Sequence, residues 1–356
     1  MNKNKCINIL NELGAGALLL CDEANMHYIC SFSPSEGMIL ITKDGAAYHL
    51  VDSRYTETAQ NHSKETGLSV IEVQKDFISE LKKLIDKHNI SSLVFENETI
   101  SYSRYEKIKN ELDKIELIKL NDKLMRIRNR KEEEELSLLK EANAIAEKSF
   151  LELLNFVEEG KSEKELAAQF DYLMAKNGSD GLSFETILLT GANTSMPHGV
   201  PSHQKIKKGD FVLFDFGATY KGYHSDMTRT VAVQSASDEM KEMYYLVLKA
   251  QNAGINALKA GVKCADVYNA ANDVLKEKGM EKYFRHGLGH GVGLEIHEGF
   301  NASPRSKDTY EVGNVTSIEP GIYIPNKFGI RIEDVCFVTE NGCENISTVD
   351  KELIII

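Results

Sequence analysis

The apolar positions of the first 120 residues form short runs, separated by stretches with helical spacing. The runs predict strands at Ala17–Leu20, Gly37–Ile41, Ala46–Val51, Val70–Val73 and Ser92–Phe95. The turn Lys43-Asp44-Gly45 would join the second and third runs as a hairpin. Helices are expected to end near Gly14 and to span about 76–88. This alternation predicts an α/β domain over residues 1–124, with few side chains suited to chemistry.

The residue composition of the chain changes near residue 125. A polar and basic stretch, Asn121–Arg130, leads into the charged run Lys131–Glu135. Apolar side chains then recur at steps of three and four from Leu136 to Val157, which predicts an amphipathic helix. Its acidic first turn suits the positive end of the helix dipole. A second domain is therefore expected over residues 125–356.

The second domain shows the same order of elements twice. A further helix opens at the capping box formed by Ser162 and Glu165. The remaining predicted elements are strands at Phe211–Gly217 and Thr228–Val233, helices at Asp238–Ala260 and Ala265–Lys278, and strands at Asn314–Ile318 and Ile330–Thr339. Two halves of the form helix–helix–strand–strand predict a pseudo-symmetric domain of α+β type with a site between its halves.

Composition narrows the class of protein. The chain has 356 residues, of which 42% are hydrophobic and 27% charged, the balance of a two-domain globular protein. Its formal net charge of −12 disfavours nucleic acid and anionic membranes as partners. The six cysteines are scattered without a C-x-x-C pair, which favours free thiols in a reducing cytoplasm. No apolar run is long enough for a signal peptide or a membrane span, so we expect a cytoplasmic protein.

The first half of the second domain places two carboxylates on or beside its strands. Asp215 lies within the apolar run Phe211–Gly217, where an acid is costly to bury unless it is paired or binds a metal. Asp226 follows eleven residues later. That separation suits two neighbouring strands joined by a turn at Lys221-Gly222.

The second half offers a matching pair of acids. Glu319 lies at the end of a predicted strand, and Glu333 lies within the next one. Alternation along that strand would put Arg331 and Glu333 on one face. Asp334 competes with Glu333, but it would share its face with apolar neighbours, so Glu333 is preferred.

A glycine-rich run, Arg285–Gly293, lies between these acids and contains His286 and His290. Four glycines in seven residues do not favour a helix, so the two histidines are not a helical zinc pair. The glycines are expected to let the backbone fold closely around an imidazole that reaches a metal. His297 precedes Glu298, but the zinc motif H-E-x-x-H is not completed.

Taken singly, each of these features has an ordinary structural explanation. A lone strand aspartate is more often a salt bridge than a ligand, and a lone histidine is usually a core or surface residue. Four acids and one imidazole that converge from paired halves are not explained by these ordinary roles. That set suits two hard divalent ions that share bridging carboxylates, and it favours manganese, with cobalt, magnesium or zinc as alternatives.

These residues and their surroundings resemble the pita-bread metallopeptidases, the family of aminopeptidase P, prolidase and methionine aminopeptidase. The resemblance runs, in the family's order, through Phe211–Thr230, His286–His297, Ser317–Gly321 and Gly329–Asp334. The run Met196–Pro201 matches a further signature of the proline-directed branch. The resemblance implies a pita-bread catalytic domain at 125–356, preceded by a creatinase-like α/β domain at 1–124.

The resemblance also implies a role for each matched residue. Asp215 would hold one metal ion, Asp226 and Glu333 would bridge two, and His290 and Glu319 would complete the second site. A hydroxide between the ions would attack the scissile carbonyl, with Glu319 as general base. His198 and His297 would stabilise the oxyanion and position substrate, and Arg331 would anchor the bridging carboxylate. His286 would line the pocket near the proline.

The N-terminal domain helps to choose between branches of the family. Methionine aminopeptidases typically lack such a domain, and creatinase lacks the metal ligands found here. The stretch Asp52–Glu57 resembles small bacterial aminopeptidase P-like proteins, although it also suits an ordinary strand-to-helix turn. An Xaa-Pro aminopeptidase is therefore the first hypothesis, a prolidase restricted to Xaa-Pro dipeptides the second, and a non-catalytic binding protein the third. A homodimer is implied by the resemblance alone.

Overall fold

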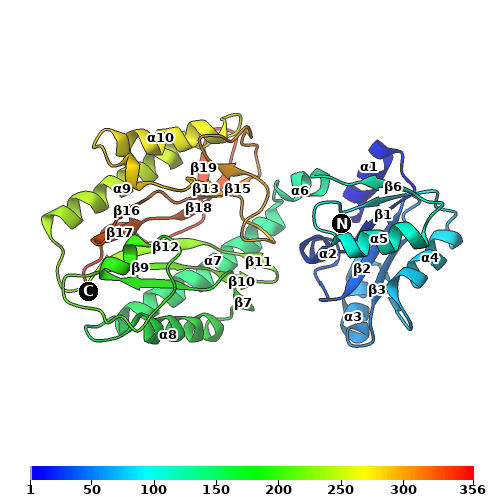
Figure 1. Cartoon of the computed structure of the whole chain (residues 1–356), viewed down its shortest axis with the longest axis horizontal. Coiled ribbons are helices and arrows are strands. Elements are labelled where there is room, and N and C mark those ends of the chain that lie inside the picture. Colours follow the sequence, from blue (N-terminus) through cyan, green and yellow to red (C-terminus); the bar gives the residue numbers. More distant parts are fainter. Residues whose placement is uncertain (1) are drawn as a thin grey trace. The chain divides into compact units, whose positions relative to one another are not determined.

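The computed structural model describes residues 2–356 and divides the chain into two compact units. The first unit ends at Arg128, and the second is Asn129–Ile356. The boundary expected after residue 124 falls inside helix α6 (Lys123–Arg128), which belongs to the first unit. The first unit has one sheet and one buried apolar cluster, and the second has several sheets and two such clusters (Figure 1).

The first unit is built on a six-stranded mixed sheet with the order β4-β3-β2-β1-β5-β6. Its strands are β1 (Ala17–Leu20), β2 (Gly37–Thr42), β3 (Ala47–Val51), β4 (Ser69–Glu72), β5 (Ser92–Phe95) and β6 (Glu116–Lys119). The predicted hairpin joins β2 to β3, and Gly45 takes the positive φ of 91° that its turn requires. The five strands expected from the apolar runs are thus confirmed.

Helices pack on this sheet along their apolar faces. They are α1 (Lys3–Leu13), α2 (Glu23–Cys30), α3 (Thr56–Thr66), α4 (Phe77–Lys87), α5 (Tyr102–Glu111) and α6. Asp76 caps α4 by accepting a hydrogen bond from the Ser79 amide. The segment Asp52–Glu57 is an exposed turn from β3 into α3, in which the Asp52 carboxylate accepts from the Arg54 backbone and guanidinium groups. Its local structure is therefore that of a strand-to-helix turn.

The first half of the second unit packs two helices against a three-stranded sheet. The helices are α7 (Glu133–Leu153) and α8 (Glu163–Lys176), followed respectively by the short 3-10 helix η1 (Leu154–Phe156) and the strand β7 (Gly181–Leu182). The sheet has the order β12-β9-β8, with β8 (Ile187–Thr190), β9 (Phe211–Phe216) and β12 (Met227–Ala232). Both the α7 amphipathic helix and the Ser162–Glu165 capping box are confirmed. A hairpin of β10 (Ala218–Tyr220) and β11 (Tyr223–His224) extends from this half.

The second half repeats this arrangement with helices α9 (Asp238–Ala257) and α10 (Cys264–Lys276). Its strands are β13 (Gly289–His290), β14 (Asn301–Ala302), β15 (Val315–Ile318), β16 (Gly321–Ile324), β17 (Phe328–Arg331), β18 (Asp334–Val338) and β19 (Cys343–Asn345), with the short 3-10 helices η2 (Gly191–Ser195) and η3 (Glu281–Tyr283) in the connections of the unit. In Figure 1, α7 and α8 lie on one side of the strands of this unit, and α9 and α10 lie on the other. The pseudo-symmetric α+β architecture expected from the sequence is thus confirmed.

The single strand predicted at Ile330–Thr339 is wrong. The chain forms β17, leaves strand geometry at Ile332 and Glu333, and resumes as β18 in another sheet. Within the break, the Glu333 amide donates to the Thr228 carbonyl oxygen of β12 at 3.1 Å. An apolar run cannot reveal such a break, because both flanking strands are buried and equally hydrophobic.

The long helices of the second unit carry charge in their first turns. Helix α7 begins with three glutamates, and α9 begins with Asp238 and Glu239.

Over residues 2–356, no helix is both long and apolar enough to cross a membrane.

Candidate metal centre and active site

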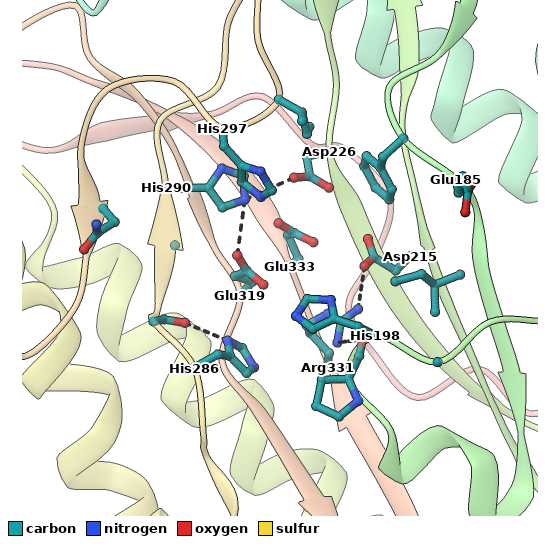
Figure 2. A pocket seen from close by; sticks show the side chains of 18 of the residues that line it. Glu185, His198, Asp215, Asp226, His286, His290, His297, Glu319, Arg331 and Glu333 are labelled. Atoms are coloured by element: carbon teal, nitrogen blue, oxygen red, sulfur yellow. Dashed lines mark hydrogen bonds and ion pairs between the residues drawn. The ribbon is translucent and has the colours of Figure 1, made fainter. Parts of the chain in front are cut away.

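One cavity of about 690 Å³ in the second unit gathers every side chain that the sequence singled out. These nine residues are His198, Asp215, Asp226, His286, His290, His297, Glu319, Arg331 and Glu333. Figure 2 shows the carboxylates of Asp226, Glu319 and Glu333 turned toward one another beside His290. The convergence of the two halves on one site is therefore a property of the fold.

The acids of the first half come from neighbouring strands. Asp215 in β9 pairs with Thr228 in β12, and Asp226 immediately precedes β12. The predicted turn is present, since Lys221 and Gly222 have φ values of 47° and 84°. It closes the hairpin β10–β11, which is inserted between β9 and β12. The register of β9 and β12 thus brings both carboxylates to the same cavity.

The ligand candidates of the second half lie at strand ends. His290 ends β13, Glu319 directly follows β15, and Glu333 lies in the break between β17 and β18. The competing Asp334 forms buried ion pairs with Arg229 at 2.8 Å and Lys351 at 2.9 Å. Glu333 lines the cavity, whereas Asp334 stabilises the interior behind it.

The glycine-rich run allows three chain segments to approach closely. A Cβ at Gly289 would lie 1.9 Å from the Ser317 carbonyl oxygen, and one at Gly291 would lie 1.9 Å from the Glu298 carbonyl oxygen. Any side chain at these positions would push β13 away from its neighbours. The glycines therefore allow the close chain approach that leaves His290 Nε2 at 3.4 Å from Glu319 Oε1.

Crowding of the buried acids favours their neutral forms. Burial raises the pKa of Asp226 well above its usual range, and repulsion from Asp215 and Glu319 raises it further. Burial, followed by repulsion from Asp226, raises the pKa of Glu333 in the same way. Burial also raises the pKa of Glu319 to about 8, against the lowering effect of Arg331. The protein alone therefore supplies too little positive charge for all of these carboxylates to be ionised.

His290 presents a lone pair to this cluster. Its Nδ1 lies 3.1 Å from the Gly291 carbonyl oxygen, which places the ring proton on Nδ1. Burial lowers the pKa of His290 to about 4, so the ring is neutral and Nε2 carries no proton. Nε2 lies 3.4 Å from Asp226 Oδ2 and 3.4 Å from Glu319 Oε1. Three electron-rich atoms at these distances repel one another unless a proton or a cation lies among them.

The donor set fits a divalent metal ion. Ligand atoms of Asp226, His290 and Glu333 all lie within 4.8 Å of one another. The Oε1 atom of Glu333 is buried and has no hydrogen-bond partner among residues 2–356, whereas its Oε2 accepts from Thr228 at 2.7 Å. An unpaired buried carboxylate oxygen is costly unless a cation compensates it. Carboxylates with one imidazole are the ligands that hard and borderline divalent ions prefer.

Arg331 contacts the cluster at two points. Its Nη2 donates to Asp215 Oδ2 at 2.5 Å, and its Nε donates to Thr228 Oγ1 at 3.0 Å. Because the same hydroxyl donates to Glu333, Thr228 links Arg331 to Glu333. Arg331 thus reaches Glu333 through Thr228 and contacts Asp215 directly.

His286 belongs to a hydrogen-bonded chain on the wall of the cavity. Its Nδ1 lies 2.7 Å from the Gly287 carbonyl oxygen, and its Nε2 lies 2.9 Å from the Tyr323 hydroxyl. Burial lowers the pKa of His286 to about 3, so Nδ1 donates and Nε2 accepts from Tyr323. Arg331 in turn donates to the Tyr323 oxygen at 2.6 Å. His286 is thus held through its ring nitrogens while its ring faces the cavity.

His198 and His297 lie on loops at the rim of the site, and both side chains are exposed. The His297 ring stands edge-on to the His290 ring, with centroids 4.3 Å apart. His198 follows η2 in the connection between β8 and β9. Exposed imidazoles beside a metal-ligand cluster are accessible to a bound substrate.

Sequence reasoning missed three residues that shape this site. Tyr323 and Thr228 connect Arg331 to His286 and Glu333, and Arg305 lines the same cavity. Alternation along β16 would have placed Tyr323 on one face of a strand, but it does not identify its partners. Arg305 lies in an irregular segment after β14, where no periodic signal exists.

Comparisons with known proteins agree along the whole chain. The family model for metallopeptidase family M24 matches residues 137–340, and the model for the creatinase/prolidase N-terminal domain matches residues 3–130. The chain is similar to the solved structure of an Xaa-Pro dipeptidase from Bacillus anthracis, at 39% identity and a TM-score of 0.94 over 100% of both chains. It is also similar to an X-Pro aminopeptidase from Thermotoga maritima, at 36% identity and a TM-score of 0.94 over 99% of both chains. A curated Xaa-Pro dipeptidase of Pyrococcus furiosus is 36% identical over 98% of both chains.

Proposed function

The chain belongs to metallopeptidase family M24, and from this premise we propose that it hydrolyses the bond between an N-terminal residue and proline. The observation behind the proposal is the group of Asp226, His290 and Glu333, whose ligand atoms lie within 4.8 Å of one another in the cavity. The names of the relatives supply the substrate class, because they are Xaa-Pro dipeptidases and an X-Pro aminopeptidase.

The proposed cofactor is a pair of divalent ions, with manganese as the first choice. Asp215, Asp226, His290, Glu319 and Glu333 would hold them. Ions bound there would polarise the scissile carbonyl and lower the pKa of water. Bound ions would lower the pKa of Glu319, so its carboxylate would be free to take up a proton during the attack of water.

The remaining cavity residues would bind and orient the substrate. His198 and His297 are exposed at the rim and are the proposed hydrogen-bond donors to the oxyanion. His286 is proposed to line the proline subsite, because its ring forms part of the wall. Arg331 is proposed to fix the Asp215 carboxylate, which it contacts at 2.5 Å.

A second candidate, an enzyme restricted to Xaa-Pro dipeptides, is favoured by Arg305. This exposed cation lines the cavity that holds the acid cluster. The free carboxylate of a dipeptide needs a positive partner, whereas a longer peptide presents a neutral amide at the same point. Two of the relatives reported above are Xaa-Pro dipeptidases. Arg305 therefore gives the dipeptidase a physical basis that the sequence alone did not provide.

The test is hydrolysis of Ala-Pro, Ala-Pro-Ala and Ala-Ala-Ala by the manganese-loaded protein. Cleavage of the proline substrates, with Ala-Ala-Ala resistant, is the expected result. A preference for Ala-Pro-Ala would identify an aminopeptidase, and cleavage of Ala-Pro alone would identify a dipeptidase. Equal cleavage of Ala-Ala-Ala would contradict the specificity for proline. Inactivity on all three, with metal bound, would favour the non-catalytic alternative.

The setting of the enzyme is also a proposal. All six cysteines are free thiols, which supports a reducing cytoplasmic compartment. The net charge of −12 supports peptides, and not nucleic acid or a membrane surface, as partners. A homodimer is proposed from the family resemblance, and size-exclusion chromatography with light scattering tests it.

A further inference from the structure

Each half of the second unit contains a buried carboxylate that closes a loop carrying one of the rim histidines. In the first half this residue is Glu163, the first residue of α8, whose exposed fraction is 0%. Its Oε1 accepts from the Thr190 amide at 2.8 Å and from the Asn193 side chain at 2.9 Å. Its Oε2 accepts from the Ser202 amide at 2.8 Å and the Ser202 hydroxyl at 2.6 Å. One side chain thus ties together both ends of the loop 190–202, which contains His198.

The corresponding residue in the second half is Glu298, which directly follows His297. Its Oε2 accepts from the amides of Leu294 and Glu295 at 3.0 and 3.3 Å. Its Oε1 forms an ion pair with Lys131 at 2.7 Å, and both side chains are 1% exposed. Its own amide donates to the Gly291 carbonyl oxygen at 2.9 Å. Glu298 therefore closes the loop 291–298 and joins it to the start of the second unit.

The surrounding backbone is shaped to admit the Glu298 carboxylate. A Cβ at Gly293 would lie 2.7 Å from both of its oxygens, so only glycine leaves room there. The Lys131 amide donates to the Gly313 carbonyl oxygen at 2.8 Å, which fixes the backbone that carries the ammonium group. The ion pair is therefore built from ordered segments on both sides.

We propose that Glu163 and Glu298 are positioning residues, which hold His198 and His297 in place for the reaction. This inference rests on the proposed function, in which both histidines contact the reacting groups. An exposed imidazole on a loop has many accessible positions, and a displacement of about 1 Å can cost about 10²-fold in rate. A buried carboxylate with several fixed donors removes that freedom without itself touching the substrate.

A purely structural role for the two carboxylates makes a different prediction. A carboxylate that only supports the fold would slow the reaction independently of the histidine on its loop. A carboxylate that acts through its histidine has no further effect once that histidine is absent. Double-mutant cycles on kcat distinguish these cases, and the two sites provide crossed controls for each other.

The variants are Glu163→Gln, which leaves an amide nitrogen facing two donors, and Lys131→Met combined with Glu298→Gln. The combined variant avoids leaving a buried ammonium group without a counterion. Each of these variants is made in three backgrounds: the wild type, His198→Ala and His297→Ala. Glu344→Gln, which removes an exposed partner of Lys140, is the control variant. Glu163→Asp, which withdraws the carboxylate by one methylene, replaces Glu163→Gln if that variant does not fold.

Values of kcat and KM on Ala-Pro, metal content and melting temperature are measured for all variants. We expect each carboxylate variant to lower kcat about tenfold or more, with little change in KM and full metal content. The matched pairs, Glu163 with His198 and Glu298 with His297, should be no slower than the histidine variants alone. The crossed pairs should multiply their effects.

Multiplied effects in the matched pairs, or loss of metal in the carboxylate variants, would overturn the positioning role. An unchanged kcat in both carboxylate variants would also overturn it. The proposed function fails in a distinguishable way: the metal-loaded wild type would then not hydrolyse the proline substrates, whereas an unchanged kcat in His198→Ala and His297→Ala would remove only the role of the two histidines.

Discussion

The unprotonated Nε2 of His290 lies 3.4 Å from the Oδ2 atom of Asp226, so the two atoms attract each other only through a proton on the carboxyl group or through a cation. The imidazole is fixed in this orientation because Nδ1 donates to the Gly291 carbonyl oxygen. Glu319 and Glu333 add two further carboxylates to the same cavity. In the metal-free protein this contact therefore requires a proton on the carboxyl group, and a bound cation takes the place of that proton.

Asp226→Asn should have opposite effects on stability without and with metal. In the metal-free protein, the buried Asp226 carboxyl group must take up a proton on folding because its pKa is raised, and asparagine avoids that cost, so the melting temperature should rise, by about 2–4 °C for each kcal/mol gained. With manganese present, the wild type should gain stability from binding and the variant should gain less. Metal analysis should show fewer bound ions in the variant, and activity should be lost. Glu344→Gln is the control. A variant that binds metal and melts like the wild type would remove Asp226 from the metal site.

The elements that the sequence predicted well are those specified locally. Strands β1 and β5 are short apolar runs, and their bounds, Ala17–Leu20 and Ser92–Phe95, are those expected. The helix α8 begins where Ser162 and Glu165 form a capping box. The chemical type of a residue was equally informative. A charged side chain within an apolar strand, such as Asp215, can have only a few roles, because it is costly to bury.

Contacts between distant segments were not accessible in this way. Neither the break at Glu333 nor the link from Arg331 through Tyr323 to His286 follows from periodicity. In the sequence, Glu163 is an ordinary acidic residue in the first turn of a helix. Only the folded chain shows that its carboxylate accepts hydrogen bonds from both Thr190 and Ser202. Residues that come together only when distant segments fold onto each other leave no local pattern in a single sequence.

Arg331→Lys should retain the positive charge and lose most of the function. The guanidinium group donates to Asp215, Thr228 and Tyr323 at once, and an ammonium group cannot match that geometry. We expect kcat on Ala-Pro to fall by about 10-fold or more, because a displaced carboxylate disturbs the site. Steady-state kinetics with metal analysis checks this. Lys327→Arg, a change at an exposed ion pair with Glu239, should leave kcat unchanged. Wild-type kinetics in Arg331→Lys would show that charge alone is sufficient.

Arg305→Gln should discriminate between substrates. If the guanidinium group binds the free carboxylate of a dipeptide, its loss should raise KM for Ala-Pro about tenfold or more, as expected for one charge-assisted contact. The amide Ala-Pro-NH₂ has no carboxylate, so its kinetics should change little. Neighbouring Lys307→Gln, which removes an exposed positive charge from outside the residues that line the cavity, controls for general electrostatic attraction. An equal change for both substrates would mean that Arg305 does not read the carboxylate.

His49 should make the first unit sensitive to acid. It is 1% exposed in β3, its Nε2 has no hydrogen-bond partner among residues 2–356, and burial, with a contribution from His62, lowers its pKa to about 4. The unfolded chain binds a proton near pH 6.5 and the folded chain does not, so stability is lost as pH falls from about 6.5 to about 4, by at most about 3 kcal/mol. His49→Leu should remove this loss. Urea unfolding of both proteins between pH 4.5 and 7.5, with exposed His203→Gln as control, tests it: the variant should gain on the wild type as pH falls, and a constant difference would show that His49 is not the acid-sensitive group.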